Sequence, residues 1–214
     1  MKNFIYVVLV VCLLPSLSFA GLESVSGPFT TTTPIPATST DWSSTLSFPQ
    51  FNPSLGTLEK VQIDLSGSMS TVLTITNEAT ISSSGNARTE VLITVQDAGN
   101  NLNAPELDLM NTAFSYSLGP HQSVSSGTRT KSGSSSDQYT DGAVLTEFTG
   151  TGAILLNAGT FTQTLLANTG GNTSSSQVTN AQLTGTVTYY YLIPEPTTMA
   201  LLGLGTLGLL RRKK

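Results

Sequence analysis

The chain has 214 residues with a formal net charge of −4, and charged residues make up only 10% of it, against about 25% in an average soluble protein. Residues 21–193 hold four cations and twelve acids, a net charge of about −8. This balance argues against binding of nucleic acid or anionic lipid through charge. Ser, Thr, Gly and Asn replace the missing charges, a composition typical of a β-rich extracellular domain rather than of a disordered chain.

Residues 1–20 have the pattern of a secretory signal peptide. Lys2 precedes an apolar run over residues 4–14, which Pro15 ends. Ser18 and Ala20 place small residues at −3 and −1, so signal peptidase is expected to cut between Ala20 and Gly21. The alternative interpretation is a membrane anchor that is never cleaved.

Cys12 is the only cysteine and lies inside this apolar run. Removal of the run leaves a mature chain without thiols, which excludes disulfides, thiolate catalysis and cysteine-ligated metals. Cys12 could instead be a lipoprotein acceptor, but Val10 and Val11 are bulkier than the small residues expected before such a cysteine.

Residues 21–41 are rich in Thr and Pro, which predicts a flexible or extended leader with an edge strand near residues 29–33. From Trp42 onward apolar residues recur with a period of two, between clusters of Gly, Asn and Ser. The expected strands lie at 61–67, 70–77, 89–97, 112–119 and 181–193, with two or three more in 143–168. Residues 104–111 predict a single turn, and no stretch before residue 194 has a helical stripe. The fold class is therefore expected to be all-β, an antiparallel β-sandwich over residues 42–193 with about eight to ten strands.

Two stretches, 121–142 and 168–180, hold few apolar residues. They predict either long hairpin loops or polar edge strands. Such segments often form binding surfaces, and they are also ordinary solvated connections.

Catalytic and metal-binding residues are scarce. His121 is the only histidine, and it follows Gly119 and Pro120 as a turn residue would. No Gly-x-Ser-x-Gly elbow precedes a helix, and a zinc site in its usual form needs several His or Cys ligands. We therefore expect no catalytic residues, no metal and no cofactor, and we expect that the protein is not an enzyme.

Acidic and aromatic residues offer weaker candidates. Glu106 with Asp108, or Asp137 with Asp141, could pair as carboxylates, and Asp137 and Asp141 could also contribute to a calcium site. No spacing fixes either geometry, so solvated surface acids are the simpler interpretation. Trp42 and the tyrosines at 189, 190 and 191 could stack on sugars, whereas tyrosines alternating along a strand usually pack in the core.

The C-terminus combines three features in order. Pro194, Glu195 and Pro196 precede an apolar run over residues 199–210, and a basic end follows. As a helix the run would be about 18 Å long, short of the roughly 30 Å hydrocarbon core. We predict a short transmembrane helix held by a stop-transfer end that stays cytoplasmic, formed by Arg211, Arg212, Lys213 and Lys214.

This end resembles the PEP-CTERM sorting signal of Gram-negative bacteria, with Pro194, Glu195 and Pro196 as the matching triplet. The resemblance implies recognition by an exosortase, removal of the tail (residues 194–214) and export to the cell surface or an exopolysaccharide matrix. The alternative interpretation is a simple C-terminal anchor with a chance triplet.

The body resembles the choice-of-anchor E domain. The matching residues at its start are Phe51, Pro53, Leu55, Gly56, Thr57 and Leu58. Residues 147–154 and the closing residues 185–191 fit the same pattern. The resemblance implies an extracellular domain and supplies no catalytic residues. A structural explanation stands beside it: Pro53 and Gly56 would shape a turn, while Phe51, Leu55 and Leu58 would cover one end of the core.

The sequence thus predicts an exported, noncatalytic, structural or adhesive protein of the cell surface or extracellular matrix, with a transient inner-membrane intermediate. Its expected partners are signal peptidase and an exosortase, with exopolysaccharide as a further candidate. The alternatives are a carbohydrate-binding module and, last, a secreted hydrolase. A groove with an exposed aromatic row would favour the module, and a sheet face without one would favour a structural spacer.

Overall fold

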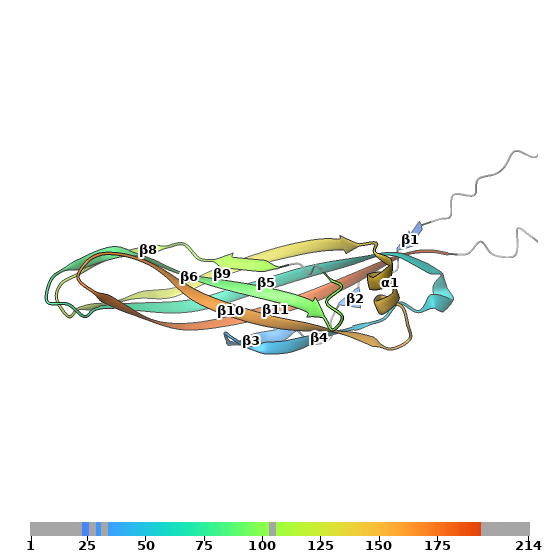
Figure 1. The fold of residues 1–214 in the computed structure, drawn as a ribbon, viewed down its shortest axis with the longest axis horizontal. Helices are drawn as coiled ribbons and strands as arrows, with labels where there is room; N and C mark the ends of the chain where they lie inside the picture. The colour runs from blue at the N-terminus through green and yellow to red at the C-terminus, as the bar shows by residue number, and fades with distance from the viewer. Residues whose placement is uncertain (1–22, 26–28, 31–33, 103–105, 194–214) are drawn as a thin grey trace, which may run out of the picture.

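The computed structural model describes residues 23–25, 29–30, 34–102 and 106–193, which form two facing antiparallel β-sheets in an elongated body (Figure 1). The strands are β1 (Glu23–Val25), β2 (Phe29–Thr30), β3 (Ile35–Ser39), β4 (Ser43–Pro49), β5 (Thr57–Asn77), β6 (Ser83–Asp97), β7 (Leu107–Met110), β8 (Phe114–Leu118), β9 (Ser123–Tyr139), β10 (Ala153–Gly170) and β11 (Thr173–Leu192). The first sheet has the order β1-β11-β5-β9, and β2 and β3 also pair with β11. The second has the order β4-β10-β6-β7, and β8 also pairs with β6. The prediction of an all-β antiparallel fold is confirmed for the described residues.

Strand β5 is the longest element, with 21 residues. The sequence predicts two strands here, at 61–67 and 70–77, with a turn between them. That turn is absent, because Gly67 and Met69 face inward while Ser66, Ser68 and Ser70 face outward, so the period of two continues without a break. At about 3.3 Å per residue the strand spans about 70 Å, which sets the length of the body.

Three local predictions are wrong. The expected turn at 104–111 contains a strand, β7. The region 143–168, expected to be strands only, begins with a short helix, α1 (Gly142–Phe148), and continues as the single strand β10. Helix α1 forms because Asp141 accepts a hydrogen bond from the N–H of Ala143 at 2.9 Å, and because Val144 and Phe148, four residues apart, both face the core.

The two polar stretches are strands rather than loops. Residues 123–139 form β9, an edge strand of the first sheet, and residues 168–180 divide between the end of β10 and the start of β11. Of the two alternatives for the stretch 121–142, the polar edge strand is the one observed. In the leader, β2 lies where an edge strand was expected, and Ile35 of β3 is buried against the core.

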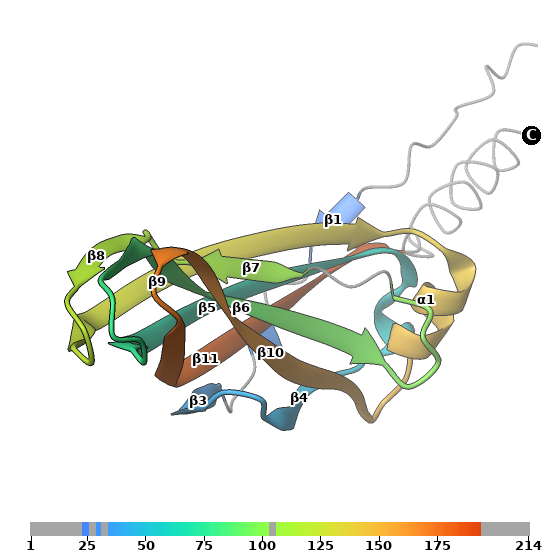
Figure 2. The same ribbon diagram turned by 60° about the vertical axis from the view of Figure 1, so that its left-hand side comes forward.

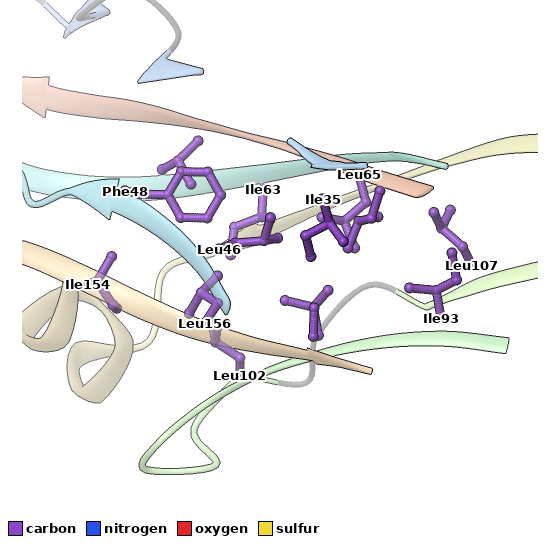
Figure 3. Packing of buried hydrophobic residues seen from close by; sticks show 14 of the residues in the cluster. Ile35, Leu46, Phe48, Ile63, Leu65, Ile93, Leu102, Leu107, Ile154 and Leu156 are labelled. Atoms are coloured by element: carbon purple, nitrogen blue, oxygen red, sulfur yellow. The ribbon is translucent and has the colours of Figure 1, made fainter. Parts of the chain in front are cut away.

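The core between the sheets has two apolar clusters. The larger lies at the α1 end and includes residues labelled in Figure 3, among them Phe48, Ile63 and Leu156. The smaller lies toward the other end and consists of Leu73, Ile75, Ala87, Phe114, Tyr116 and Leu118.

A buried hydroxyl group cluster joins the sheets beside these apolar residues. The Oγ1 atom of Thr71 in β5 lies 2.7 Å from that of Thr179 in β11 and 3.3 Å from that of Thr89 in β6. Asn111 accepts a hydrogen bond from the N–H of Thr89 at 3.1 Å and so satisfies a further buried group.

The two ends of the body differ. Three connections between the two sheets lie at one end, where β5 leads into β6, β8 into β9 and β10 into β11 (Figure 1). Asn77 ties the first two together, since its Nδ2 donates to the carbonyls of Ile81 (2.8 Å) and Gly119 (2.9 Å). The opposite end carries α1 and the last residues of β11. The described part of the chain therefore ends at the α1 end of the body, opposite these three connections.

No helix among the described residues is long and apolar enough to cross a membrane. The predicted signal peptide and the predicted transmembrane helix at 199–210 lie outside the described residues.

Candidate functional site

The most distinctive surface is the outer face of the first sheet. Where strands β11, β5 and β9 lie side by side, their outward side chains are almost all small and hydroxylated or amide-bearing. We call this surface the hydroxyl face and define it as Ser66, Ser68, Ser70, Thr130, Ser132, Ser134, Ser136, Asn180, Gln182, Thr184 and Thr186. None of these residues is charged, and none is aromatic.

The pairing register aligns these residues in rows across the three strands. Ser68 of β5 lies opposite Gln182 of β11 and Ser132 of β9. Ser66 likewise lies opposite Thr184 and Ser134. Because opposite residues in an antiparallel pair share a face, each row presents three polar side chains to solvent.

Hydrogen bonds fix the hydroxyl face at the α1 end. The Oδ1 atom of Asp64 accepts a hydrogen bond from the Nε2 of Gln62 at 2.9 Å and another from the hydroxyl of Ser136. Gln62 Oε1 in turn accepts from Gln138 at 3.1 Å and from the hydroxyl of Tyr190 at 3.0 Å. The carboxylate of Asp64 is thus oriented by hydrogen bonds from its neighbours.

Two shallow depressions mark the hydroxyl face. One, of about 310 Å³, is lined by Asp64, Ser66, Ser134, Ser136, Thr184 and Thr186, among others. The other, of about 340 Å³, is lined by Ser68, Ser70, Thr130, Ser132, Asn180 and Gln182, among others. Apart from the carboxylate of Asp64, the polar groups of these linings are hydroxyls and amides, which can donate and accept hydrogen bonds.

A second candidate is a pair of carboxyl groups at the α1 end. Asp97, at the end of β6, is 4% exposed and accepts hydrogen bonds from the N–H groups of Asn101 (3.0 Å) and Leu102 (2.9 Å). Glu147 in α1 lies beside it, and Glu147 Oε2 is buried without a hydrogen-bond donor. Two carboxylates cannot hydrogen-bond to each other unless one of them keeps a proton.

The surroundings of the two carboxyl groups shift their pKa values in opposite directions. Burial raises the pKa of Glu147, and the contact with Asp97 and its negative charge raise it further. Burial also acts to raise the pKa of Asp97, but the backbone donors of Asn101 and Leu102 outweigh it and lower that pKa. Of the two carboxyls, Glu147 is therefore the one that keeps a proton to the higher pH. Neither carboxyl lines the depressions described above, so this pair joins α1 to the loop after β6 rather than facing a substrate cavity.

Substituting Glu147→Gln is expected to stabilise the protein at neutral pH. A raised folded-state pKa gives stability that is present below the ordinary glutamate pKa and is lost as pH rises through the folded value. The Gln amide donates to Asp97 at every pH, so this loss disappears. We expect a melting temperature about 1–4 °C above that of the unsubstituted protein at pH 7–8, with no difference near pH 4. Thermal melts across this range measure it, with Glu106→Gln, an exposed acid, as the control. If the melting temperature of the Glu147→Gln variant at pH 8 equals or falls below that of the unsubstituted protein, the raised pKa of Glu147 is contradicted.

The carboxylate pairs expected from the sequence are not brought together as sites. Glu106 and Asp108 are exposed at the start of β7. Asp137 is exposed on β9, while Asp141 caps α1 and so has a structural role. Among the described residues, no group of three or more His, Cys, Asp or Glu side chains is placed to hold a metal ion. His121 lies in the β8–β9 turn with a φ of 57°.

The aromatic candidates are not gathered on the hydroxyl face. Tyr189 is fully buried, donates a hydrogen bond to the carbonyl of Pro49 at 2.6 Å, and has its pKa raised by burial. Tyr191 packs on Phe51, with ring centroids 4.9 Å apart. Tyr190 lies on the outer side with Lys60 Nζ 3.8 Å from its ring centroid, and Trp42 packs against the core.

The motif at residues 51–58 forms the α1 end of the body. Phe51 and Leu58 are buried as expected, whereas Leu55 is 49% exposed, so its expected contribution to the core is wrong. Pro53 begins a 3₁₀ turn (Pro53–Leu55) that Gly56 ends with a φ of 152°. Residues 147–154 lie beside this turn, since the N–H of Phe51 donates to the carbonyl of Phe148 at 2.8 Å.

The remaining sequence candidates lie outside the described residues. These are the cleavage pair Ala20 and Gly21, the triplet Pro194, Glu195 and Pro196, and the basic residues Arg211, Arg212, Lys213 and Lys214.

Comparison with known proteins identifies a sorting motif at the C-terminal end of the chain. Residues 192–214 match the PEP-CTERM protein-sorting motif. The motif implies export and exosortase-dependent sorting to the cell surface, and it begins where β11 ends. The match covers the C-terminal end alone, and the resemblance of the body to the choice-of-anchor E domain stays a prediction.

Other comparisons add little. No curated protein matches the chain. One solved structure, titled "Structure of infectious bursal disease virus Gt strain", aligns at 14% identity with a TM-score of 0.14. The alignment covers 90% of this chain and 50% of that chain, so this chain spans about half the length of that protein. A similarity this low supports no inference about the fold or the function.

Proposed function

We propose that the protein is a noncatalytic structural or adhesive component of the cell surface or extracellular matrix, and that the hydroxyl face is its contact surface. The PEP-CTERM motif supports the destination. The observation that carries the role of the body is the hydrogen-bonding surface of three long strands, in which Asp64 is the one charged residue among the rows of hydroxyl and amide side chains. Such a surface matches a hydrated, hydroxyl-rich polymer, since each row can exchange hydrogen bonds with it.

The carbohydrate-binding module ranks second. Modules that grip single sugars use aromatic rings in a groove, and the hydroxyl face has neither. Phe161, which is 61% exposed, lies on the outer face of the other sheet beside Leu92. A broad surface making many weak contacts agrees better with a spacer or adhesive that holds a polymer along its length.

Acidic substitutions on the hydroxyl face test this proposal. The variant Ser66→Glu, Asn180→Glu and Gln182→Glu changes three exposed residues, on β5 and β11 only. The added charges raise the desolvation cost of contact, so we expect the exported protein to shift from the matrix into the medium by about fivefold or more, about 1 kcal/mol. Fractionation of the native cells followed by immunoblotting measures this shift.

The control places three acids on the opposite surface, in Ser84→Glu, Thr94→Glu and Gln96→Glu, at exposed positions of β6. This variant is expected to stay in the matrix. If both variants distribute like the unsubstituted protein, the hydroxyl face is not the contact surface. If both variants shift from the matrix into the medium to the same extent, overall charge and not the hydroxyl face controls retention, and the proposal fails.

A further inference from the structure

Strand β9 is a long free edge of the first sheet. Among the described strands it pairs only with β5, and it runs along the upper margin of the body in Figure 2. An edge strand presents unpaired N–H and C=O groups that can pair with another strand. The other edge of this sheet differs, because β1, β2 and β3 all pair along β11.

The free edge is regular over most of its length. A bulge near its start, where Gly127 has a φ of 63°, shifts the register against β5. The next twelve residues, 128–139, contain no proline and pair regularly with β5 up to Tyr139. The described edges of the second sheet are shorter: β7 has four residues, β8 has five, and β4 has seven and ends in Pro49.

Charges on β9 select one way of pairing. In the regular stretch 128–139, Arg129 and Lys131 lie in the first half and Asp137 in the second half, and odd-numbered positions share one face. Inward-facing charges on an edge normally discourage pairing. Here a second β9 running antiparallel would place opposite charges against each other, whereas a parallel copy in register would place Lys131 against Lys131.

We propose that β9 pairs antiparallel with β9 of a second copy of this chain, with Ser134 on the twofold axis. In this register Lys131 of each copy lies opposite Asp137 of the other copy, so two opposite-charge pairs form. On the outer face Ser132 lies opposite Ser136 of the other copy, which extends the hydroxyl face from one copy to the next. Hydroxyl pairs and opposite-charge pairs across strands both stabilise a sheet.

The antiparallel arrangement also fixes the direction of the two bodies. In each copy β11 ends at the α1 end of the body, opposite the three connections between the sheets. The two α1 ends therefore point in opposite directions. The pairing joins copies that approach each other from opposite sides, as an adhesive contact between two surfaces requires.

A single cysteine at the twofold axis tests the pairing. The full-length gene carrying Ser134→Cys is expressed in the native cells, which are oxidised intact and examined on non-reducing gels. The natural chain, whose only cysteine is Cys12, is the background control. Across the axis the two Ser134 side chains are close enough for a disulfide, whereas two Ser132 side chains would lie about 13 Å apart along the strands. We expect at least fivefold more disulfide dimer from Ser134→Cys than from Ser132→Cys. Equal yields, or none, would overturn the proposal.

A charge swap tests the register by a separate route. Within the Ser134→Cys chain, Lys131→Glu creates two like-charge pairs and should lower the dimer yield about threefold or more. Adding Asp137→Lys restores opposite charges and should restore the yield. Both residues are exposed, so folding is not at stake. Failure of the double variant to recover would contradict the register. The yield of disulfide dimer does not depend on retention in the matrix. The β9 pairing and the role of the hydroxyl face can therefore fail independently of each other.

Discussion

Replacing Pro194, Glu195 and Pro196 together with alanine is expected to stop delivery to the cell surface and leave the chain in the inner membrane. The triplet lies within the matched sorting motif. Proline has no amide hydrogen and disfavours both helix and strand, so the triplet offers a processing enzyme a constrained backbone beside a carboxylate. Alanine removes this constraint and the carboxylate together. We expect the amount in matrix and medium to fall at least tenfold.

The termini of the delivered protein complete this experiment. Mass spectrometry of the natural chain from matrix or medium should find a start at Gly21 and no residues 199–214. The double variant Thr197→Ala and Thr198→Ala, which leaves the triplet intact, is the matched control and should be delivered normally. Unchanged delivery of the triplet variant, or an intact tail on the delivered natural chain, would contradict sorting by the triplet.

Substituting Gly56→Ala is expected to cause the largest loss of stability of any single change considered for the body. Gly56 has a φ of 152°, a region that side chains rarely adopt, and a Cβ there would lie 2.1 Å from the carbonyl oxygen of Leu192. That oxygen belongs to the backbone of β11, so it cannot rotate away as a side chain would. We expect a loss of about 2–4 kcal/mol and a melting temperature lower by about 5–15 °C.

The matched control is Gly142→Ala. Gly142 begins α1, and no heavy atom lies within 4 Å of the position of an added Cβ. Alanine there should leave the melting temperature unchanged or slightly higher, since it favours the helix. Thermal unfolding of both purified variants, followed by circular dichroism, makes the comparison. A melting temperature of Gly56→Ala within about 2 °C of the natural protein would show that the turn relaxes without cost.

The fold class follows from the sequence because alternation of apolar and polar residues is local information. Val61, Ile63 and Leu65 mark an inward face wherever the strand ends. The ends of the strands cannot be predicted in the same way. Residues 66–70 have a composition that fits a turn as well as a strand, and it is their pairing with β9 and β11 that makes them a strand. Helix α1 escapes detection for a related reason: Val144 and Phe148 give only two points of a helical stripe.

The hydroxyl face is missed from sequence because most of β9 carries no apolar signal. Its inward positions include Lys131, Gly133 and Asp137, since the short strands β7 and β8 cover only part of that face. A usable signal is the run of Thr, Ser and Gln at alternate positions from 128 to 138, together with the similar run of Ser at 66–70 earlier in the sequence. That the two runs lie side by side depends on pairing between distant segments, which no single stretch of sequence specifies.

The position of β11 as the last strand of the body has a mechanical consequence. The chain exits directly from β11, which pairs with β5 from Thr173 to Leu192. Its hydrogen bonds to β5 lie perpendicular to the strand direction. Tension applied through the C-terminus acts along β11, so it strains these bonds in shear, many at once, instead of peeling them one after another. A body held through the end of β11 should therefore resist drag better than one held in a way that peels these bonds apart one after another.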